Sequence, residues 1–204
     1  MSDAAEKSIA LTFDDGPSPE NTPGLLDILT EYKVPASFCV LGSLIESNEY
    51  LLQRMLSLSC EIVNHSWNHE YLSKAPEEEI YENIRRTDDA IVRACGVRPR
   101  FFRPPYGASN EQLQSVLIRM EKAELLWNAD PEDWKLRDTS QIISAVLDSA
   151  ADGQIVIMHD IYAPTCAAAS VIIPELLNRG YELKTVSELL KHRHPVPGRA
   201  YGHS

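Results

Sequence analysis

Apolar residues along the chain fall into short runs, and each run ends on a polar or turn-forming residue. Ile9, Leu11 and Phe13 alternate with smaller residues, which is typical of a short buried strand. This run ends on Asp14 and Asp15, which a Gly-Pro turn follows. By the same criteria, further strands are predicted at residues 36–41, 60–64, 101–103, 124–128, 154–158 and 181–185.

Between the predicted strands, the apolar residues take up helical spacing. The clearest helix is predicted from Glu77 to Cys95, with acidic residues in its first turn and Ile80, Ile84 and Ile91 on one side. Other helices are predicted at residues 22–33, 44–58, 109–122, 139–151, 172–178 and 186–191.

The order of these elements indicates the fold class. Strands and helices alternate about seven times, with connections long enough for helical crossovers between parallel strands. We therefore expect an α/β protein with a mostly parallel sheet or a distorted (β/α) barrel inside a ring of helices. No repeat, low-complexity segment or linker divides the sequence. We expect one domain over residues 8–191, with flexible termini at 1–7 and 192–204.

Charge and composition narrow the choice of partner. Nineteen Lys and Arg residues against 30 Asp and Glu residues give a net charge of −11. This charge disfavours nucleic acid or an anionic membrane and is compatible with a neutral or cationic ligand. No apolar run approaches the roughly 20 residues of a membrane span, and residues 1–7 lack the apolar region of a signal peptide.

The four cysteines do not indicate a metal ribbon. Cys39, Cys60, Cys95 and Cys166 are far apart and include no C-x-x-C pair. Their spacing leaves two disulfides or four free thiols open.

Polar residues suited to catalysis follow the predicted strands. They are Asp14 and Asp15, His65 and His69, Arg103, Asp130 and Asp133, and His159. In a (β/α) barrel the carboxyl ends of the strands form one face, where catalytic groups gather. We therefore expect these groups to meet at one site.

Two carboxylates and two histidines suggest a metal centre. Adjacent strand residues point to opposite sides, so one of Asp14 and Asp15 would ligate a cation while the other handles a proton. His65 and His69 are four apart, and on a helical turn both imidazoles would share one face. A carboxylate with two histidines leaves coordination positions open for water and substrate. Taken singly, each group also has a structural interpretation, such as a solvated turn, a surface arginine or a core histidine.

Five motifs follow one another along the chain: T-F-D-D-G-P (12–17), H-S-W-N-H (65–69), R-P-P-Y-G (103–107), D-P-E-D-W (130–134) and I-V-I-M-H-D (155–160). In this order they resemble the motifs of the NodB-type polysaccharide deacetylases, carbohydrate esterase family four, which includes chitin and peptidoglycan deacetylases. The resemblance extends over residues 8–191 and implies a distorted (β/α) barrel.

The resemblance implies a metal and a base. Asp15, His65 and His69 would bind one divalent ion, zinc or cobalt. Asp14 would be the general base. Arg103 would orient Asp14 and tune it.

The remaining motif residues would act on the substrate. The Tyr106 backbone amide would help to hold the oxyanion, and Trp134 and Ile157 would line the pocket for the acetyl methyl group. His159, tuned by Asp133, would be the general acid.

The implied activity is hydrolysis of N-acetyl groups in an N-acetylglucosamine polymer or oligomer, with release of acetate. A chitin-like substrate is expected, and peptidoglycan is the alternative. Two other interpretations stay open: a catalytically weak or silent carbohydrate-binding relative, and a small-molecule amide deacetylase. We expect a monomer, which the resemblance places outside the cell or at the cell wall.

Val63 departs from the family pattern, which usually has a small residue, commonly glycine, two positions before the first metal histidine. On an extended strand, Val63 and His65 share a face. The valine would either pack in the core or crowd the metal site. In the second case, activity on simple chito-oligomers would be weak, and Val63→Gly would raise it or tighten metal binding.

Overall fold

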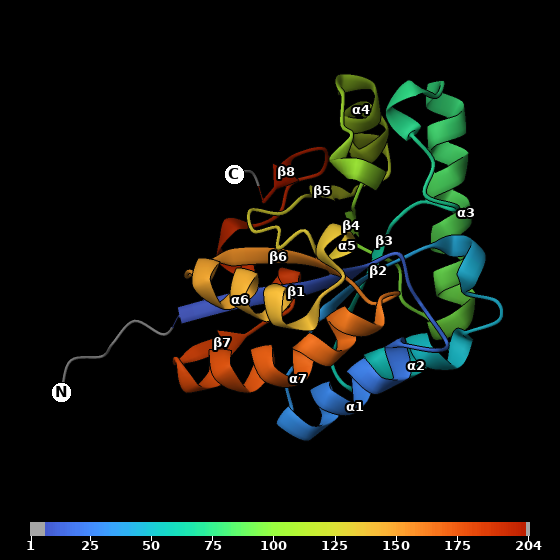
Figure 1. Ribbon diagram of the computed structural model, residues 1–204. Helices are drawn as coiled ribbons and strands as arrows, with labels where there is room; N and C mark the ends of the chain where they lie inside the picture. Colours follow the sequence, from blue (N-terminus) through green and yellow to red (C-terminus); the bar gives the residue numbers. More distant parts are fainter. Residues whose placement is uncertain (1–6, 203–204) are drawn as a thin grey trace.

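The computed structural model describes residues 7–202, and its strands form one parallel sheet with helices packed outside it (Figure 1). The strand order is β6-β1-β2-β3-β4-β5-β8, and β7 pairs with β1. The strands are β1 (Lys7–Asp14), β2 (Ser37–Val40), β3 (Glu61–Asn64), β4 (Phe101–Phe102), β5 (Ala123–Leu125), β6 (Gln154–His159), β7 (Tyr181–Leu183) and β8 (Ala200–Tyr201).

Strand β1 is the centre of the sheet because it pairs along both edges. Residues 9–14 pair with β6 along one edge. Along the other edge, residues 7–9 pair with β7 and residues 12–14 with β2. Asp14 is thereby the register partner of His159, so a carboxylate and an imidazole stand side by side at the strand ends.

The barrel closes through an irregular segment instead of a long strand. Beyond β5, the N–H groups of Asn128 and Ala129 donate to the Ile155 carbonyl at 3.2 and 3.3 Å, and Ile157 N–H donates to the Ala129 carbonyl at 3.0 Å. Ala129 also forms an isolated parallel bridge with Val156. These contacts join the end of β5 back to β6 and produce the predicted distorted (β/α) barrel.

Helices connect the strands on the outside of the sheet (Figure 1). They are α1 (Thr22–Tyr32), α2 (Glu49–Ser57), α3 (Glu77–Cys95), α4 (Glu111–Arg119), α5 (Asp133–Leu136), α6 (Thr139–Ser149), α7 (Ala163–Asn178) and α8 (Val186–Leu189), with short 3₁₀ turns η1 (Gly42–Leu44), η2 (Leu72–Lys74), η3 (Pro105–Gly107) and η4 (Lys191–Arg193). No helix within residues 7–202 is both long and apolar enough to cross a membrane.

Local capping explains where several helices begin and end. The side chains of Asn110, Asp138 and Thr185 accept hydrogen bonds from the first turns of α4, α6 and α8. Gly96 ends α3 with φ 77°, a left-handed conformation that glycine adopts without strain.

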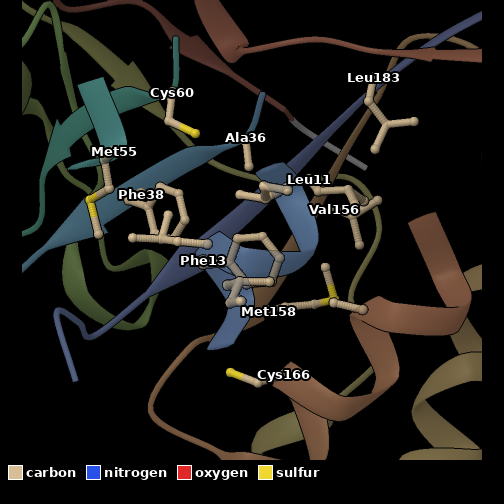
Figure 2. Close-up of a cluster of buried hydrophobic side chains, with 14 of the residues drawn as sticks. Leu11, Phe13, Ala36, Phe38, Met55, Cys60, Val156, Met158, Cys166 and Leu183 are labelled. Atoms are coloured by element: carbon tan, nitrogen blue, oxygen red, sulfur yellow. The ribbon is translucent and has the colours of Figure 1, made fainter. Parts of the chain in front are cut away.

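Alternate residues of each strand face two different cores. Leu11 and Phe13 of β1 belong to the larger core, which also contains Phe38, Val156 and Met158 (Figure 2). Residues of the opposite face fill the barrel interior, and α8 closes the amino-terminal end of that interior. The interior cluster consists of Ala10, Cys39, Val63, Phe101, Ala123, Leu125, Ile155, Val186, Leu190 and Tyr201. All four cysteines are free thiols.

Four sequence predictions need correction. The helix expected at 172–178 is α7, which already begins at Ala163. The helix expected at 44–58 begins only at Glu49, after the 3₁₀ turn η1. The strand expected at 124–128 is β5, residues 123–125. The expected flexible termini at 1–7 and 192–204 differ from the structure, since Lys7 begins β1 and β8 pairs with β5 through Leu125 and Tyr201. Residues 1–6 and 203–204 lie outside the described part of the chain.

Val63 is fully buried in the barrel interior. It lies beside its register partner Cys39 and two residues before His65. His65 keeps its hydrogen bond to the Arg103 carbonyl at 2.7 Å, so the valine does not displace it. The packing interpretation therefore fits the structure, and the crowding interpretation has no support in the geometry.

We predict that Val63→Gly destabilises the fold by about 2–4 kcal/mol, from the lost apolar burial, the cavity and the added chain entropy. Urea unfolding measures this change. Val196→Gly is the matched control, because Val196 is exposed and the same substitution there should change stability by less than about 1 kcal/mol. Unchanged stability, or tighter zinc binding by Val63→Gly, would instead favour the crowding interpretation.

Candidate active site

The residues predicted from sequence meet at the carboxyl ends of the strands. Eight of the ten residues with an assigned role line one cavity of about 410 Å³: Asp14, Asp15, His65, His69, Tyr106, Trp134, Ile157 and His159. The other two, Arg103 and Asp133, are fully buried and hydrogen-bond to cavity residues.

Asp15, His65 and His69 form a group that fits a metal ion, with one ligand atom from each within 4.8 Å of the others. Asp15 Oδ1 lies 3.4 Å from both histidine Nε2 atoms. Tetrahedral bonds of about 2.1 Å would place ligand atoms about 3.4 Å apart. The same oxygen is buried and has no hydrogen-bond partner among residues 7–202. An orphaned carboxylate oxygen between two imidazole nitrogens is consistent with a bound cation.

The chain reaches this arrangement through left-handed residues and not through the expected helical turn. Asp15 follows β1 with φ 71°, which turns its carboxylate into the cavity beside Asp14. Ser66 and His69 have φ 70° and 62°, and the Ser66 hydroxyl accepts a hydrogen bond from His69 N–H at 2.9 Å. The two histidines therefore converge through a tight turn after β3. Both carboxylates face the same cavity, contrary to simple strand alternation.

Arg103 connects Asp14 to the metal-type group through His65. Its Nη1 donates to Asp14 Oδ1 at 2.6 Å and to the Thr12 hydroxyl at 2.7 Å, and its Nη2 donates to the Leu126 carbonyl at 3.0 Å. The Arg103 carbonyl lies 2.7 Å from His65 Nδ1. Because a carbonyl only accepts, Nδ1 of His65 carries the proton and Nε2 presents its lone pair to the cavity.

Asp133 holds His159 from two directions. Its Oδ1 lies 2.8 Å from His159 Nδ1, and its Oδ2 accepts the His159 backbone N–H and the Thr165 hydroxyl, both at 2.8 Å. Burial alone would lower the pKa of His159. The hydrogen bond with Asp133 and the negative charge of Asp14 outweigh it and raise that pKa to about 9. The imidazole is therefore held as a proton donor.

Charges also act on the metal group. Burial opposes ionisation of Asp15, yet the neighbouring His65 and His69 rings lower its pKa. Burial and the neighbouring His65 lower the pKa of His69. Both shifts favour the forms that bind cations, an ionised carboxylate and a neutral imidazole.

Tyr106 presents a free backbone amide at the cavity. It has φ 61° within η3, and its N–H donates no hydrogen bond to any residue between 7 and 202. Such an amide is available to an oxygen of a bound molecule.

A buried polar network, which the motifs did not reveal, supports the turn after β3. Asn64 Nδ2 donates to Asp88 Oδ1 at 2.8 Å, and Asn64 Oδ1 accepts Ser66 N–H at 3.0 Å. The Lys122 ammonium lies 2.8 Å from Asp88 Oδ2, and both charged groups are buried. Fully satisfied networks of this kind fix local geometry. Only the position of Asn64, directly before His65, could have signalled it.

Asp160 plays a similar part beneath the Asp14–Asp15 turn. It is fully buried, and its Oδ2 accepts a hydrogen bond from the Thr22 hydroxyl, which in turn accepts Ser18 N–H at 2.8 Å. A Cβ atom at Gly16 would collide with the Asp160 carboxylate, so this turn needs glycine. Burial raises the pKa of Asp160 to about 7.

Four further residues line the cavity without a predicted role: Pro104, Trp127, Asp130 and Tyr162. The sequence analysis expects Asp130 at this site only because it follows a predicted strand. Trp127 and Tyr162 follow β5 and β6 closely. Their positions just after strands are the sequence feature that could have identified them as cavity residues.

Comparison with known proteins gives consistent matches. The polysaccharide deacetylase family model matches residues 2–123. The peptidoglycan-N-acetylmuramic acid deacetylase PdaC of Bacillus subtilis is 44% identical over 187 residues, which are 92% of this chain and 39% of PdaC. The chain thus spans about two fifths of the length of PdaC.

Two other proteins match over nearly their whole length. The chitooligosaccharide deacetylase of a Bradyrhizobium species is 34% identical, with 90% of each chain covered. The structure of a family 4 acetyl xylan esterase from Clostridium thermocellum in complex with a cobalt ion superposes with a TM-score of 0.89 at 33% identity, covering 96% of this chain and 98% of the other.

We predict that the raised pKa of His159 makes stability depend on pH in chelator-treated protein. A folded-state pKa above the unfolded value contributes stability that is complete below the unfolded pKa, about 6.5, and is lost as pH rises through about 9. Urea unfolding between pH 6 and 10 should show a loss of about 3 kcal/mol in the wild type.

His159→Gln removes the titrating group and should remove most of this slope. His194→Gln is the matched control, because His194 is exposed and is not among the hydrogen-bond partners of Asp133. Parallel pH curves for the wild type and His159→Gln would contradict the prediction.

Proposed function

The chain belongs to the polysaccharide deacetylase family, and on this premise we propose that it hydrolyses N-acetyl groups of an N-acetylglucosamine-containing glycan, uses one divalent metal, and releases acetate. The observation that carries the proposal is a single cavity shared by a metal-type triad and an acid–base pair. Asp14 and His159 are register partners on adjacent strands, and the triad of Asp15, His65 and His69 lies against them.

Asp15, His65 and His69 would hold the metal, with His65 Nε2 and His69 Nε2 as nitrogen ligands. Their donor set of one carboxylate and two imidazoles suits zinc or cobalt. When bound, such an ion polarises the acetyl carbonyl and lowers the pKa of water.

Asp14 would accept the proton of the attacking water. Its carboxylate is buried and receives a charge-assisted hydrogen bond from Arg103, so its orientation is fixed before substrate arrives. Oδ1 is engaged with Arg103 and Oδ2 lies 3.7 Å from His65 Nε2, so Oδ2 is the oxygen placed to take the proton.

His159 would protonate the leaving amine. An amide nitrogen leaves only after protonation, and the Asp133 contact keeps His159 charged at neutral pH. The free amide of Tyr106 would stabilise the oxyanion that forms on the acetyl oxygen. Trp134 and Ile157 would surround the acetyl methyl group.

The charge of the cavity favours a neutral sugar. Its lining includes the carboxylates of Asp14, Asp15 and Asp130 and, among residues 7–202, no lysine or arginine side chain. With His159 charged and a divalent ion bound, these three carboxylates would be balanced, so an uncharged N-acetylglucosamine unit leaves the site neutral. We propose a chitin-like oligomer as the substrate, with the N-acetylglucosamine units of peptidoglycan as the alternative.

Two related proposals concern the setting of the reaction. Every residue assigned above comes from one chain, which supports a monomer. Peptidoglycan, which the name of PdaC gives as its substrate, is a cell-wall polymer, so we propose that the enzyme acts outside the cell or at its wall.

Acetate release from N-acetylglucosamine oligomers, with zinc or cobalt added, tests this function. The proposed enzyme releases acetate and leaves free amines in equal amount. Oligomer binding without acetate would indicate the silent carbohydrate-binding relative. Activity that does not rise with oligomer length, together with turnover of small amides, would indicate a small-molecule deacetylase.

We predict that one zinc or cobalt ion binds per chain and that His65→Ala and His69→Ala each lower the affinity by at least about tenfold, since each removes one of three protein ligands. Calorimetric titration of chelator-treated protein measures this. His192→Ala is the control, because His192 is exposed and remote from the cavity lining. Equal metal affinity in all four proteins would exclude this ligand set.

We predict that Asp14→Asn abolishes acetate release while metal still binds, because Asp14 moves a proton and Asp15 ligates. His159→Ala should also retain metal and lose roughly 100-fold or more in turnover. Metal titration and acetate assays on the same preparations separate binding from catalysis. If Asp14→Asn loses the metal and Asp15→Asn retains it, the two carboxylates have the opposite roles.

A further inference from the structure

Two exposed tyrosines stack against each other beside the cavity. The rings of Tyr71 and Tyr106 have centroids 4.4 Å apart and planes inclined by 15°. Tyr106 exposes 58% of its surface and Tyr71 exposes 48%. We call this pair the tyrosine ledge.

The tyrosine ledge extends outward from the metal group. Tyr106 lines the cavity, and its ring contacts the His69 ring edge-to-face with centroids 4.4 Å apart. Tyr71 is absent from the cavity lining and stands against Tyr106, so it is the next ring along the surface. The Lys74 ammonium lies 4.6 Å from the Tyr71 ring centroid and helps to hold the ring in place.

Exposed aromatic rings are concentrated around this opening. Four aromatic side chains within residues 7–202 expose about half of their surface: Tyr50, Tyr71, Tyr106 and Trp134. Tyr106 and Trp134 line the cavity, Tyr71 adjoins it, and Tyr50 alone lies elsewhere, on α2. Neighbouring exposed apolar groups at a cavity mouth indicate a surface that binds a ligand.

We propose that the tyrosine ledge binds the sugar unit next to the one whose acetyl group enters the cavity, with Tyr71 as the residue that contacts this second sugar. This inference rests on the proposed deacetylase function. A tyrosine offers a rigid apolar ring and a polar tip, and it loses little conformational entropy on binding. A neutral sugar matches both parts, since its C–H groups can contact the ring and its hydroxyls can bond the phenol.

The polar tips of the tyrosine ledge are available for such bonds. Neither phenolic hydroxyl forms a hydrogen bond with another residue between 7 and 202. The cavity, at about 410 Å³, suits one N-acetyl sugar. The rest of an oligomer must therefore lie outside the cavity, and Tyr71 is the exposed ring stacked on Tyr106 of the lining.

Binding energy from a remote sugar should appear as a gain in kcat/KM with oligomer length. We expect Tyr71→Ala to lower kcat/KM on the tetramer and pentamer by about three- to tenfold, the scale of one aromatic contact. The shortest oligomer that the wild type cleaves should change by less than about twofold. Tyr71→Phe keeps the ring and should retain most of the length dependence.

Tyr50→Ala is the matched control, because Tyr50 is comparably exposed and lies on α2, outside the cavity lining. Tyr71→Leu provides a second variant without the ring should Tyr71→Ala be less stable. Calorimetric binding of the tetramer to Asp14→Asn, with and without Tyr71→Ala, adds a readout that requires no turnover. Tetramer affinity should fall by the same three- to tenfold factor.

The outcomes separate this inference from the function on which it rests. Wild-type protein that releases no acetate from any oligomer overturns the proposed function. If the wild type is active and Tyr71→Ala matches Tyr50→Ala at every length, the sugar contact is wrong. An equal loss at all lengths, including the shortest, also overturns it, since Tyr71 would then only support Tyr106.

Discussion

The buried guanidinium of Arg103 is the interaction on which the site depends. Its side chain donates to Asp14, while its own carbonyl accepts from His65 Nδ1. One residue thus sets the orientation of the Asp14 carboxylate and the tautomer of His65. A buried arginine is costly unless it is paired, and here Asp14 is also buried, so each charge stabilises the other. Removing either partner would leave the other uncompensated.

Around this pair, the site is built from strand ends that turn abruptly. Asp15 and His69 reach the cavity only because each has a left-handed backbone. Such conformations persist where the surroundings determine them. Asp160 lies beneath the first turn, and the contact of Asn64 with Asp88 lies beneath the second. Buried polar groups that do not themselves line the cavity therefore fix the positions of the residues that do.

Much of this could be predicted from local sequence. Strand periodicity and helical crossovers dictate a parallel sheet, and polar residues directly after strands must gather at one face. The features that the sequence did not predict depend on long-range strand pairing or on backbone conformation. Closure through Ala129 depends on pairing with β6, which no local pattern records. The spacing of His65 and His69 predicts a helical turn, but the positive φ of Ser66, which the sequence does not reveal, produces a tighter one. The pairing of β8 with β5 was missed because the tail is polar and contains proline.

Acetate release and zinc content of Arg103→Lys test the central claim most directly. The substitution changes the side chain that orients Asp14 and leaves the backbone carbonyl that fixes His65. We predict that the variant binds one zinc ion as the wild type does, yet loses about 100-fold in turnover, the scale expected when a general base is misplaced. Wild-type turnover in a folded Arg103→Lys protein, or loss of zinc from it, would contradict this account. In the account, the Arg103 side chain orients Asp14 and its backbone carbonyl fixes His65.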